Sequence, residues 1–241
     1  MLFHEISTAR GIGLFQKPSD NASRTHCLRC GECCLKASPT LQKKDLHLIR
    51  RGAIGKKDLF TIRKGELVRD NIAETLVIAG EEMIKLRERE GGCCVLYDAA
   101  EKACKIYEER PLQCSALKCW DPSEFMKVYE GPKLQRRDVA EGMLLLDLIT
   151  EHEARCSYER LEGYMKEIEG EGEKAIQEII DLLNFDFQLR PFISDKLQID
   201  PEEMAFLFGR PLVDTVPMFG LKVSREADGT FFLSPLENHI R

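Results

Sequence analysis

Four cysteines within eight residues are the feature that most restricts how this chain can fold. Cys27, Cys30, Cys33 and Cys34 follow the spacing C-x2-C-x2-C-C. Thiolates are strong ligands for zinc and for iron–sulfur clusters. The charge of Arg29 favours deprotonation of the thiols beside it. The loop therefore predicts a metal site around which the neighbouring chain must fold.

The ten cysteines of the chain favour metal ligation over disulfide bonds. The stretch 1–13 has no apolar core long enough for a signal peptide, and the longest apolar run, 143–146, is too short to span a bilayer. We therefore expect a cytoplasmic protein without membrane association, in a compartment that keeps thiols reduced. Cysteines that gather in short loops are also typical of metal sites, so disulfides are the weaker alternative.

The net charge of −6 argues against a nucleic-acid partner, because phosphate binding usually needs a basic surface. Only a zinc-knuckle-like use of the cysteine loop would restore that alternative. With 43% apolar and 32% charged residues, the composition is that of a soluble globular protein.

The order of patterns along the chain predicts an α+β protein in three parts. Residues 1–26 contain scattered glycines and a proline and read as an irregular N-terminal segment. Residues 27–120 form the small cysteine-rich metal-binding domain with short strands, and residues 121–241 a mainly α-helical half that packs against it. Expected elements are helices over 41–51, 138–152, 158–169 and 174–190, strands over 82–87, 94–97 and 104–107, and a hairpin over 221–233.

Two glycines and one apolar stripe refine the helices that we expect in the second half of the chain. Gly170 and Gly172 are expected to break the helix that begins near Tyr158. The stretch 138–152 carries apolar residues around most of its circumference, which predicts a largely buried helix.

The cysteine spacing of the first loop fits two kinds of metal site, an iron–sulfur cluster and a zinc ion. In a ferredoxin loop, cysteines placed like Cys27, Cys30 and Cys33 bind three irons of one cubane. A fourth cysteine would follow soon, but Ala37-Ser38-Pro39 stands there, so any fourth ligand must come from elsewhere. The pair C-x2-C also suits one corner of a tetrahedral zinc site.

Adjacent cysteines pose a geometric question. Neighbouring side chains of an extended chain point to opposite faces. We therefore expect Cys33 and Cys34 not to bind the same ion, so that Cys34 serves a second metal or packs as a small hydrophobe. The same reasoning separates Cys93 from Cys94.

Three stretches together resemble the YkgJ-type cysteine-cluster family, also called the CxxCxxCC zinc- or iron-chelating domain. They are Cys27–Cys34, Cys94–Asp98 and the block C-x-I-Y-x-x-R-P-x-x-C over Cys104–Cys114, followed by Cys119. The resemblance covers about residues 27–120. It implies eight cysteine ligands: Cys27, Cys30, Cys33, Cys34, Cys94, Cys104, Cys114 and Cys119.

The chain departs from the family pattern beside the ligands rather than at them. Val95 and Leu96 stand where the family often has proline and phenylalanine, and Ser115 and Lys118 where it often has arginine and proline. A related motif in flagellin lysine-N-methylases gives a lead toward protein methylation. Against this lead, the chain lacks the glycine-rich strand–turn–helix usual for binding S-adenosylmethionine.

Other residues are candidates for the same centre. The guanidinium of Arg110 is expected beside the cofactor, where it would offset thiolate charge and donate hydrogen bonds to sulfur; the alternative is a plain surface arginine. Tyr107 is expected to pack in the core. His152 and Cys156 lie four positions apart on one helix face. Cys156 is therefore a further candidate metal ligand, the alternative being a buried free cysteine and a surface histidine.

These features lead to a first hypothesis and its rivals. The first is an iron–sulfur protein, with [4Fe-4S] favoured and a redox or methyl-transfer role. The second is a structural zinc module that serves interaction with an unidentified protein partner. A protein N-methyltransferase is the third. Nucleotide-binding and serine-hydrolase motifs do not occur in the sequence, and a Cys–His nucleophile using Cys156 or Cys93 is the weakest alternative.

Overall fold

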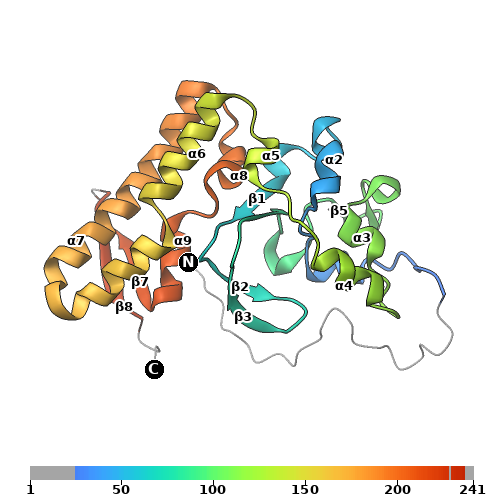
Figure 1. Cartoon of the computed structure of the whole chain (residues 1–241), viewed down its shortest axis with the longest axis horizontal. Coiled ribbons are helices and arrows are strands. Elements are labelled where there is room, and N and C mark those ends of the chain that lie inside the picture. The colour runs from blue at the N-terminus through green and yellow to red at the C-terminus, as the bar shows by residue number, and fades with distance from the viewer. Residues whose placement is uncertain (1–24, 228, 237–241) are drawn as a thin grey trace.

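The computed structural model describes residues 25–227 and 229–236, and it confirms the α+β class (Figure 1). The helices are α1 Glu32–Lys36, α2 Leu46–Arg50, α3 Leu112–Ala116, α4 Ser123–Tyr129, α5 Arg136–Val139, α6 Met143–Arg155, α7 Tyr158–Leu197, α8 Met204–Phe208 and α9 Leu212–Thr215. In the described part of the chain, no helix is both long and apolar enough to cross a membrane.

All the strand pairs of the described residues are antiparallel. They are β1 Leu59–Ile62 with β4 Met83–Leu86, β2 Leu67–Asp70 with β3 Thr75–Ile78, β5 Tyr97–Asp98 with β6 Ala103–Cys104, and β7 Leu221–Arg225 with β8 Phe231–Pro235. The strand expected over 82–87 is confirmed as β4, and the C-terminal hairpin as β7–β8. The hairpin expected over 94–107 is confirmed in a shorter form, β5–β6. The expected N-terminal segment 1–26 lies outside the described residues except for its last two.

The first core lies under the β1–β4 pair and takes residues from both halves of the chain. Leu59 faces Leu86 and Thr61 faces Ile84 in the register, and all four are buried. Helix α8 covers this face, where the hydroxyl of Thr61 donates to the carbonyl of Phe206 at 2.6 Å. Burial of each such apolar side chain stabilises the fold by roughly 1.5–3 kcal/mol. The β1–β4 pair is therefore held by a segment from near the end of the chain.

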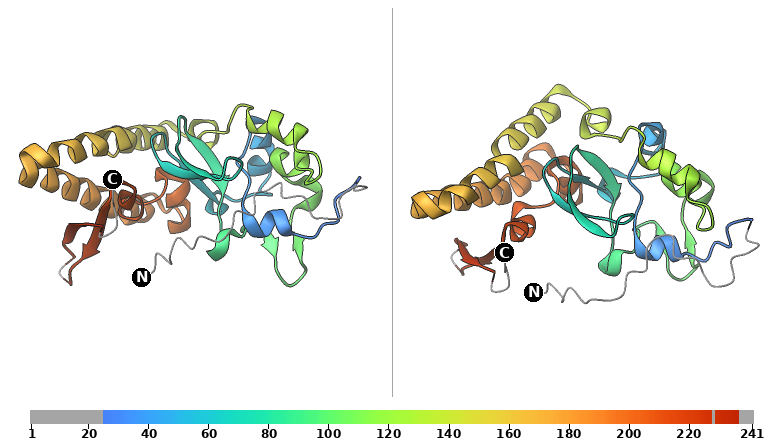
Figure 2. Two further views of the ribbon diagram at one scale, coloured as in Figure 1. Left: turned by 90° about the horizontal axis from the view of Figure 1, so that it is seen from below. Right: turned by 60° about the horizontal axis from the view of Figure 1, so that its bottom comes forward.

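The second core is built where α7 turns back on itself. The hydroxyl of Tyr164 donates to Glu178 at 3.1 Å, 14 positions further along the same helix. In a straight helix these residues would lie about 20 Å apart, so the chain reverses between them (Figures 1 and 2). Helical backbone continues through Gly170 and Gly172, so these glycines lie within the reversal without ending the helix. Leu161 and Leu183, from the two arms, meet in this core.

The helix expected over 138–152 is interrupted. Gly142 has φ +90° and separates α5 from α6. At the start of α6, the side chains of Met143 and Leu144 are 79% and 59% exposed, so the prediction of a largely buried helix is wrong there. Only the later turns, with Ile149 and His152, reach the interior.

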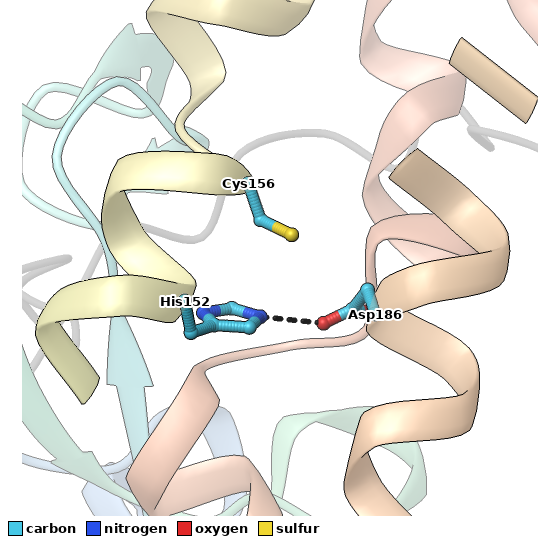
Figure 3. Close-up of side chains that lie close together, drawn as sticks. All are labelled: His152, Cys156 and Asp186. Atoms are coloured by element: carbon cyan, nitrogen blue, oxygen red, sulfur yellow. Dashed lines mark hydrogen bonds and ion pairs between the residues drawn. The ribbon is translucent and has the colours of Figure 1, made fainter. Parts of the chain in front are cut away.

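A buried polar cluster joins helices α6 and α7 (Figure 3). His152 of α6 donates from Nε2 to Asp186 of α7 at 2.7 Å. Asp186 also accepts from Arg190 Nη2 and from the backbone of Leu212, each at 2.8 Å. The carboxylate thus holds α6, α7 and the start of α9 together while its charge is balanced by Arg190.

Replacing Asp186 by alanine should lower the free energy of unfolding by about 3–5 kcal/mol, because Arg190 would be left buried without a counter-charge and His152 without its acceptor. The matched control is Asp181→Ala on the same helix, whose exposed carboxylate accepts, among the described residues, from Gln177 alone; its cost should be below about 0.5 kcal/mol. Urea unfolding measures both. Equal losses in the two variants would contradict the assigned role of Asp186.

The same cluster predicts a dependence of stability on pH. Burial lowers the pKa of His152 below its ordinary value of 6.5, although the bond to Asp186 opposes this. The unfolded chain therefore takes up a proton at higher pH than the folded one, so stability is full above the unfolded value and falls as pH falls below it. When the pH is lowered from about 7 to about 5, the free energy of unfolding should fall less in His152→Gln than in the wild type. An equal fall in both proteins would argue against a lowered pKa of His152.

Candidate metal centre

The first cysteine loop is shaped by a glycine that packs against the second cysteine group. Gly31 has φ +77° and precedes α1, and its carbonyl accepts from the amides of Cys34 and Leu35. A β-carbon at Gly31 would lie 2.6 Å from the hydroxyl of Tyr97 on β5. The amide of Cys94 donates to the carbonyl of Cys34 at 2.7 Å. These contacts bring the two cysteine groups together.

The premise that Cys33 and Cys34 point to opposite faces of an extended chain does not hold, and the expectation that they bind different ions stays a prediction. Both lie on helix α1 rather than on extended chain, and their sulfurs are 4.0 Å apart. Two thiolates bound to one zinc at 2.3 Å with tetrahedral angles would be about 3.8 Å apart. The adjacent pair therefore has the spacing of one edge of a tetrahedral thiolate site.

Two cavities together are lined by all eight cysteines that the resemblance implies. The first, of about 370 Å³ and here named the cysteine cavity, is lined by Cys27, Cys30, Cys33, Cys34, Cys104 and Cys119. The second, of about 240 Å³ and here named the apolar cavity, is lined by Cys33, Cys34, Cys94, Cys104 and Cys114 together with many apolar side chains. Cys33, Cys34 and Cys104 border both cavities.

The thiols differ in how readily they ionise. The hydrogen bond from the Cys34 thiol lowers the pKa of Cys33 to about 6, with backbone amides and Arg110 contributing. The same bond raises the pKa of Cys34. Burial raises the pKa of Cys94 to about 11 and that of Cys114 well above its ordinary value. Cys33 is thus the thiol that ionises most readily among these four, and a metal bound by Cys34, Cys94 or Cys114 must displace a proton from that thiol.

Arg110 lies close enough to the cysteines to lower the pKa of Cys33, although its effect is smaller than that of hydrogen bonding, which also lowers this pKa, and of burial, which raises it. Its guanidinium lies 4.2 Å from the centre of the Tyr107 ring and donates to the Tyr107 carbonyl at 3.1 Å. Arg29 lies 4.0 Å from the centre of the same ring. Tyr107 is half-buried and lines the cysteine cavity, so it positions two cations instead of packing in the core as expected.

Cys93 and Cys156 are not among the residues that line either cavity. Cys156 lies in the second core, where its sulfur and the ligand atoms of His152 and Asp186 are all within 4.8 Å of one another (Figure 3). Burial raises the pKa of Cys156 to about 12. The structure therefore places Cys156 as a neutral thiol in the polar cluster around Asp186, away from the other cysteines.

Sequence reasoning missed the rest of the apolar cavity. The β2–β3 hairpin and α4 form part of its wall, and Thr40, Lys85 and Gln113 line it. Gln113 belongs to the R-P-x-x-C block and Lys85 to the strand expected over 82–87. What the sequence missed is the β2–β3 hairpin, because its strands are short and show no regular alternation of buried and exposed residues.

Comparison with known proteins points to the cysteine region. Residues 26–133 match the model of the CxxCxxCC family, described as "Putative zinc- or iron-chelating domain". The "Uncharacterized protein MJ0661" of Methanocaldococcus jannaschii is 33% identical over 94 residues, which are 39% of this chain and 44% of that protein. The chain thus spans less than half of that relative's length. No solved structure matches the chain.

Replacing Gly31 by alanine should remove most of the bound metal, because the new methyl group would overlap the ring of Tyr97, which is itself buried. Gly52→Ala is the matched control: Gly52 has nearly the same φ, +76°, but a β-carbon added there would meet no atom within 4 Å. It should cost about 1 kcal/mol of backbone strain and leave metal content unchanged. Metal analysis of the two purified variants decides; equal metal content in both would contradict the role of Gly31.

Proposed function

We propose that residues 26–133, which match the model of the CxxCxxCC family, form a metal-binding domain that holds an iron–sulfur cluster, [4Fe-4S] being the favoured form. Cys27, Cys30 and Cys33 would bind three irons, and Cys104 or Cys119 from the same cavity the fourth. Bound there, the cluster would supply one-electron transfer. The proposed setting is the cytoplasm, which keeps thiols reduced.

The size of the cysteine cavity is the observation that carries this proposal. Its volume of about 370 Å³ is far more than a single ion needs. Among the described residues, His152, Cys156 and Asp186 are the one group of three with all ligand atoms within 4.8 Å of one another. The cysteines are therefore spread more widely than the ligands of one ion, which suits thiolates that bind different irons.

The chain's own residues prepare such a site. Cys33 ionises near neutral pH, so it offers a thiolate without a large cost in proton removal. Arg110 and Arg29, both held against Tyr107, place positive charge near sulfurs that carry negative charge when they bind metal. Neutralisation of this kind raises the potential at which a cluster accepts an electron.

A structural zinc module is the second candidate, and the Cys33–Cys34 spacing favours it. The 4.0 Å between the two sulfurs is close to the edge of a tetrahedral zinc site. Leu28 and Leu35 beside these cysteines are 56% and 41% exposed. They would give the folded loop an apolar surface for a protein partner. In this case metal removal would unfold the cysteine region without any redox change.

Anaerobic purification with metal and sulfide analysis tests the proposal. We expect a brown protein with about four iron and four sulfide atoms per chain, whose visible absorption fades on reduction. Cys33→Ser should lose most of the iron and sulfide. Cys156→Ala, which removes a thiol of the second core, should keep them.

A colourless wild-type protein with stoichiometric zinc would overturn the iron–sulfur proposal in favour of the zinc module. Equal iron loss in Cys33→Ser and Cys156→Ala would show that the cysteine cavity is not where iron binds. Calorimetric titration with S-adenosylmethionine separates the methyl-transfer role, which requires binding above the buffer background, from simple electron transfer.

A further inference from the structure

The β2–β3 hairpin is attached firmly at its base. The carboxylate of Glu66, which is buried, is paired there with Arg210, and the backbone amide of Leu67 donates to Met218 Sδ at 3.4 Å. Beyond this base the hairpin is a sheet of its own, with two strands of four residues each. A sheet of two strands is only marginally stable in water, so the outer part of the hairpin, residues 68–78, needs support from the rest of the protein.

A cavity lies where packing would supply that support. Residues 68–72 and 77–80 line one side of the apolar cavity, and Leu86, Leu96 and Phe125 belong to the rest of its wall. All four residues of β3 are exposed, including Ile78, which lines the cavity and is 60% exposed. Segments with few buried apolar contacts open locally at a lower cost than the core of a fold. The outer part of the hairpin is such a segment.

One hydrogen bond holds this outer part against the cysteine half. The hydroxyl of Tyr129, at the end of α4, donates to Asp70 Oδ2 at 3.0 Å, and Figure 1 shows the hairpin reaching toward α4. The other oxygen of Asp70 serves the turn of the hairpin itself, where it accepts from the amides of Ile72 and Ala73. Among the described residues, the bond to Tyr129 is the one hydrogen bond that joins residues 68–78 to another element.

The space beneath the hairpin adjoins the candidate metal centre. Cys33, Cys34 and Cys104 border both cavities, whereas Cys94 and Cys114 line the apolar cavity and not the cysteine cavity. Cys94 is only 5% exposed. A wider apolar cavity would therefore change what reaches these last two thiols more than what reaches the other cysteines.

We propose that the β2–β3 hairpin is a lid on the apolar cavity, latched by the hydrogen bond between Tyr129 and Asp70. When this bond breaks, the outer part of the hairpin swings away from α4 about the base that Arg210 holds. The cavity then opens and admits small molecules from solvent to Cys94 and Cys114. The motion is a property of the hairpin alone, whereas its use as an entrance to a metal centre rests on the proposed function.

Hydrogen exchange of the anaerobically purified full chain measures the motion. Tyr129→Phe removes the hydroxyl and keeps the ring. Loss of this bond to a carboxylate should raise the exchange rates of the amides within 67–78 about tenfold and leave those of β1 and β4 unchanged. Tyr164→Phe is the matched control, because this hydroxyl also donates to a carboxylate, that of Glu178 on α7. The hairpin of the control should exchange at the wild-type rate.

Alkylation by N-ethylmaleimide, mapped by mass spectrometry, measures the access. Cys94 and Cys114 should be labelled about tenfold faster in Tyr129→Phe than in the wild type, in step with the larger open population. The proposed cluster uses neither of these thiols, so they stay available to the reagent while it is bound. Cys156, which is buried in the second core, reports general unfolding and should be labelled equally slowly in both proteins.

Iron and sulfide analysis of the same samples separates the lid from the proposed function. Equal exchange of the hairpin in wild type and Tyr129→Phe overturns the lid, and so does faster exchange without faster labelling of Cys94 and Cys114. Faster labelling of Cys156 in the variant also overturns it, because the whole fold would then have loosened. Any of these results in an iron-loaded chain leaves the proposed function intact. The expected pattern in a chain without iron supports the lid and contradicts the proposed function.

Discussion

The backbone hydrogen bond from Cys94 to Cys34 joins two cysteine groups that are 60 positions apart in the sequence. The close packing of Gly31 on Tyr97 fixes the same junction through a second contact. Both depend on backbone and ring atoms rather than on sulfur, so the chain can bring the groups together before metal arrives. A bound metal would add charge balance, because sulfurs held this close resist joint ionisation, in line with the opposite pKa shifts of Cys33 and Cys34.

The helical half supplies more than a neighbouring surface. Arg136, which is 2% exposed, donates to Glu82 just before β4, to Glu153 on α6 and to the carbonyl of Leu207 on α8. One guanidinium thus connects the strand pair beneath the cysteines with two helices of the other half. A buried charge of this kind is stable only with all of its partners, so it fixes their relative positions as well as contributing stability.

The spacing of the cysteines predicted that they gather in one region, and the structure places eight of them around two adjoining cavities, whereas their role as ligands stays a prediction. The premise used for Cys33 and Cys34 was wrong because the direction of a side chain depends on the local backbone, and Gly31 starts a helix that no apolar period predicts. The hairpins bounded by turn residues were found, whereas β2–β3 was missed, since its strands are short and show no regular alternation of buried and exposed residues. The buried hydrogen bond of Gln113 was beyond prediction, because its partner, the amide of Thr40, lies 73 positions away.

The bond between Thr61 and Phe206 has a consequence for how the protein is made, because it spans 145 positions. Synthesis runs from the N-terminus, so every cysteine of the two cavities leaves the ribosome well before α8 exists. Until then the inner face of β1 and β4 lacks its cover, and the cysteine loops stand on an incomplete core. The final arrangement of the sulfurs is therefore complete only once α8 has been made and has packed on this face, so stable metal binding is expected to follow that step.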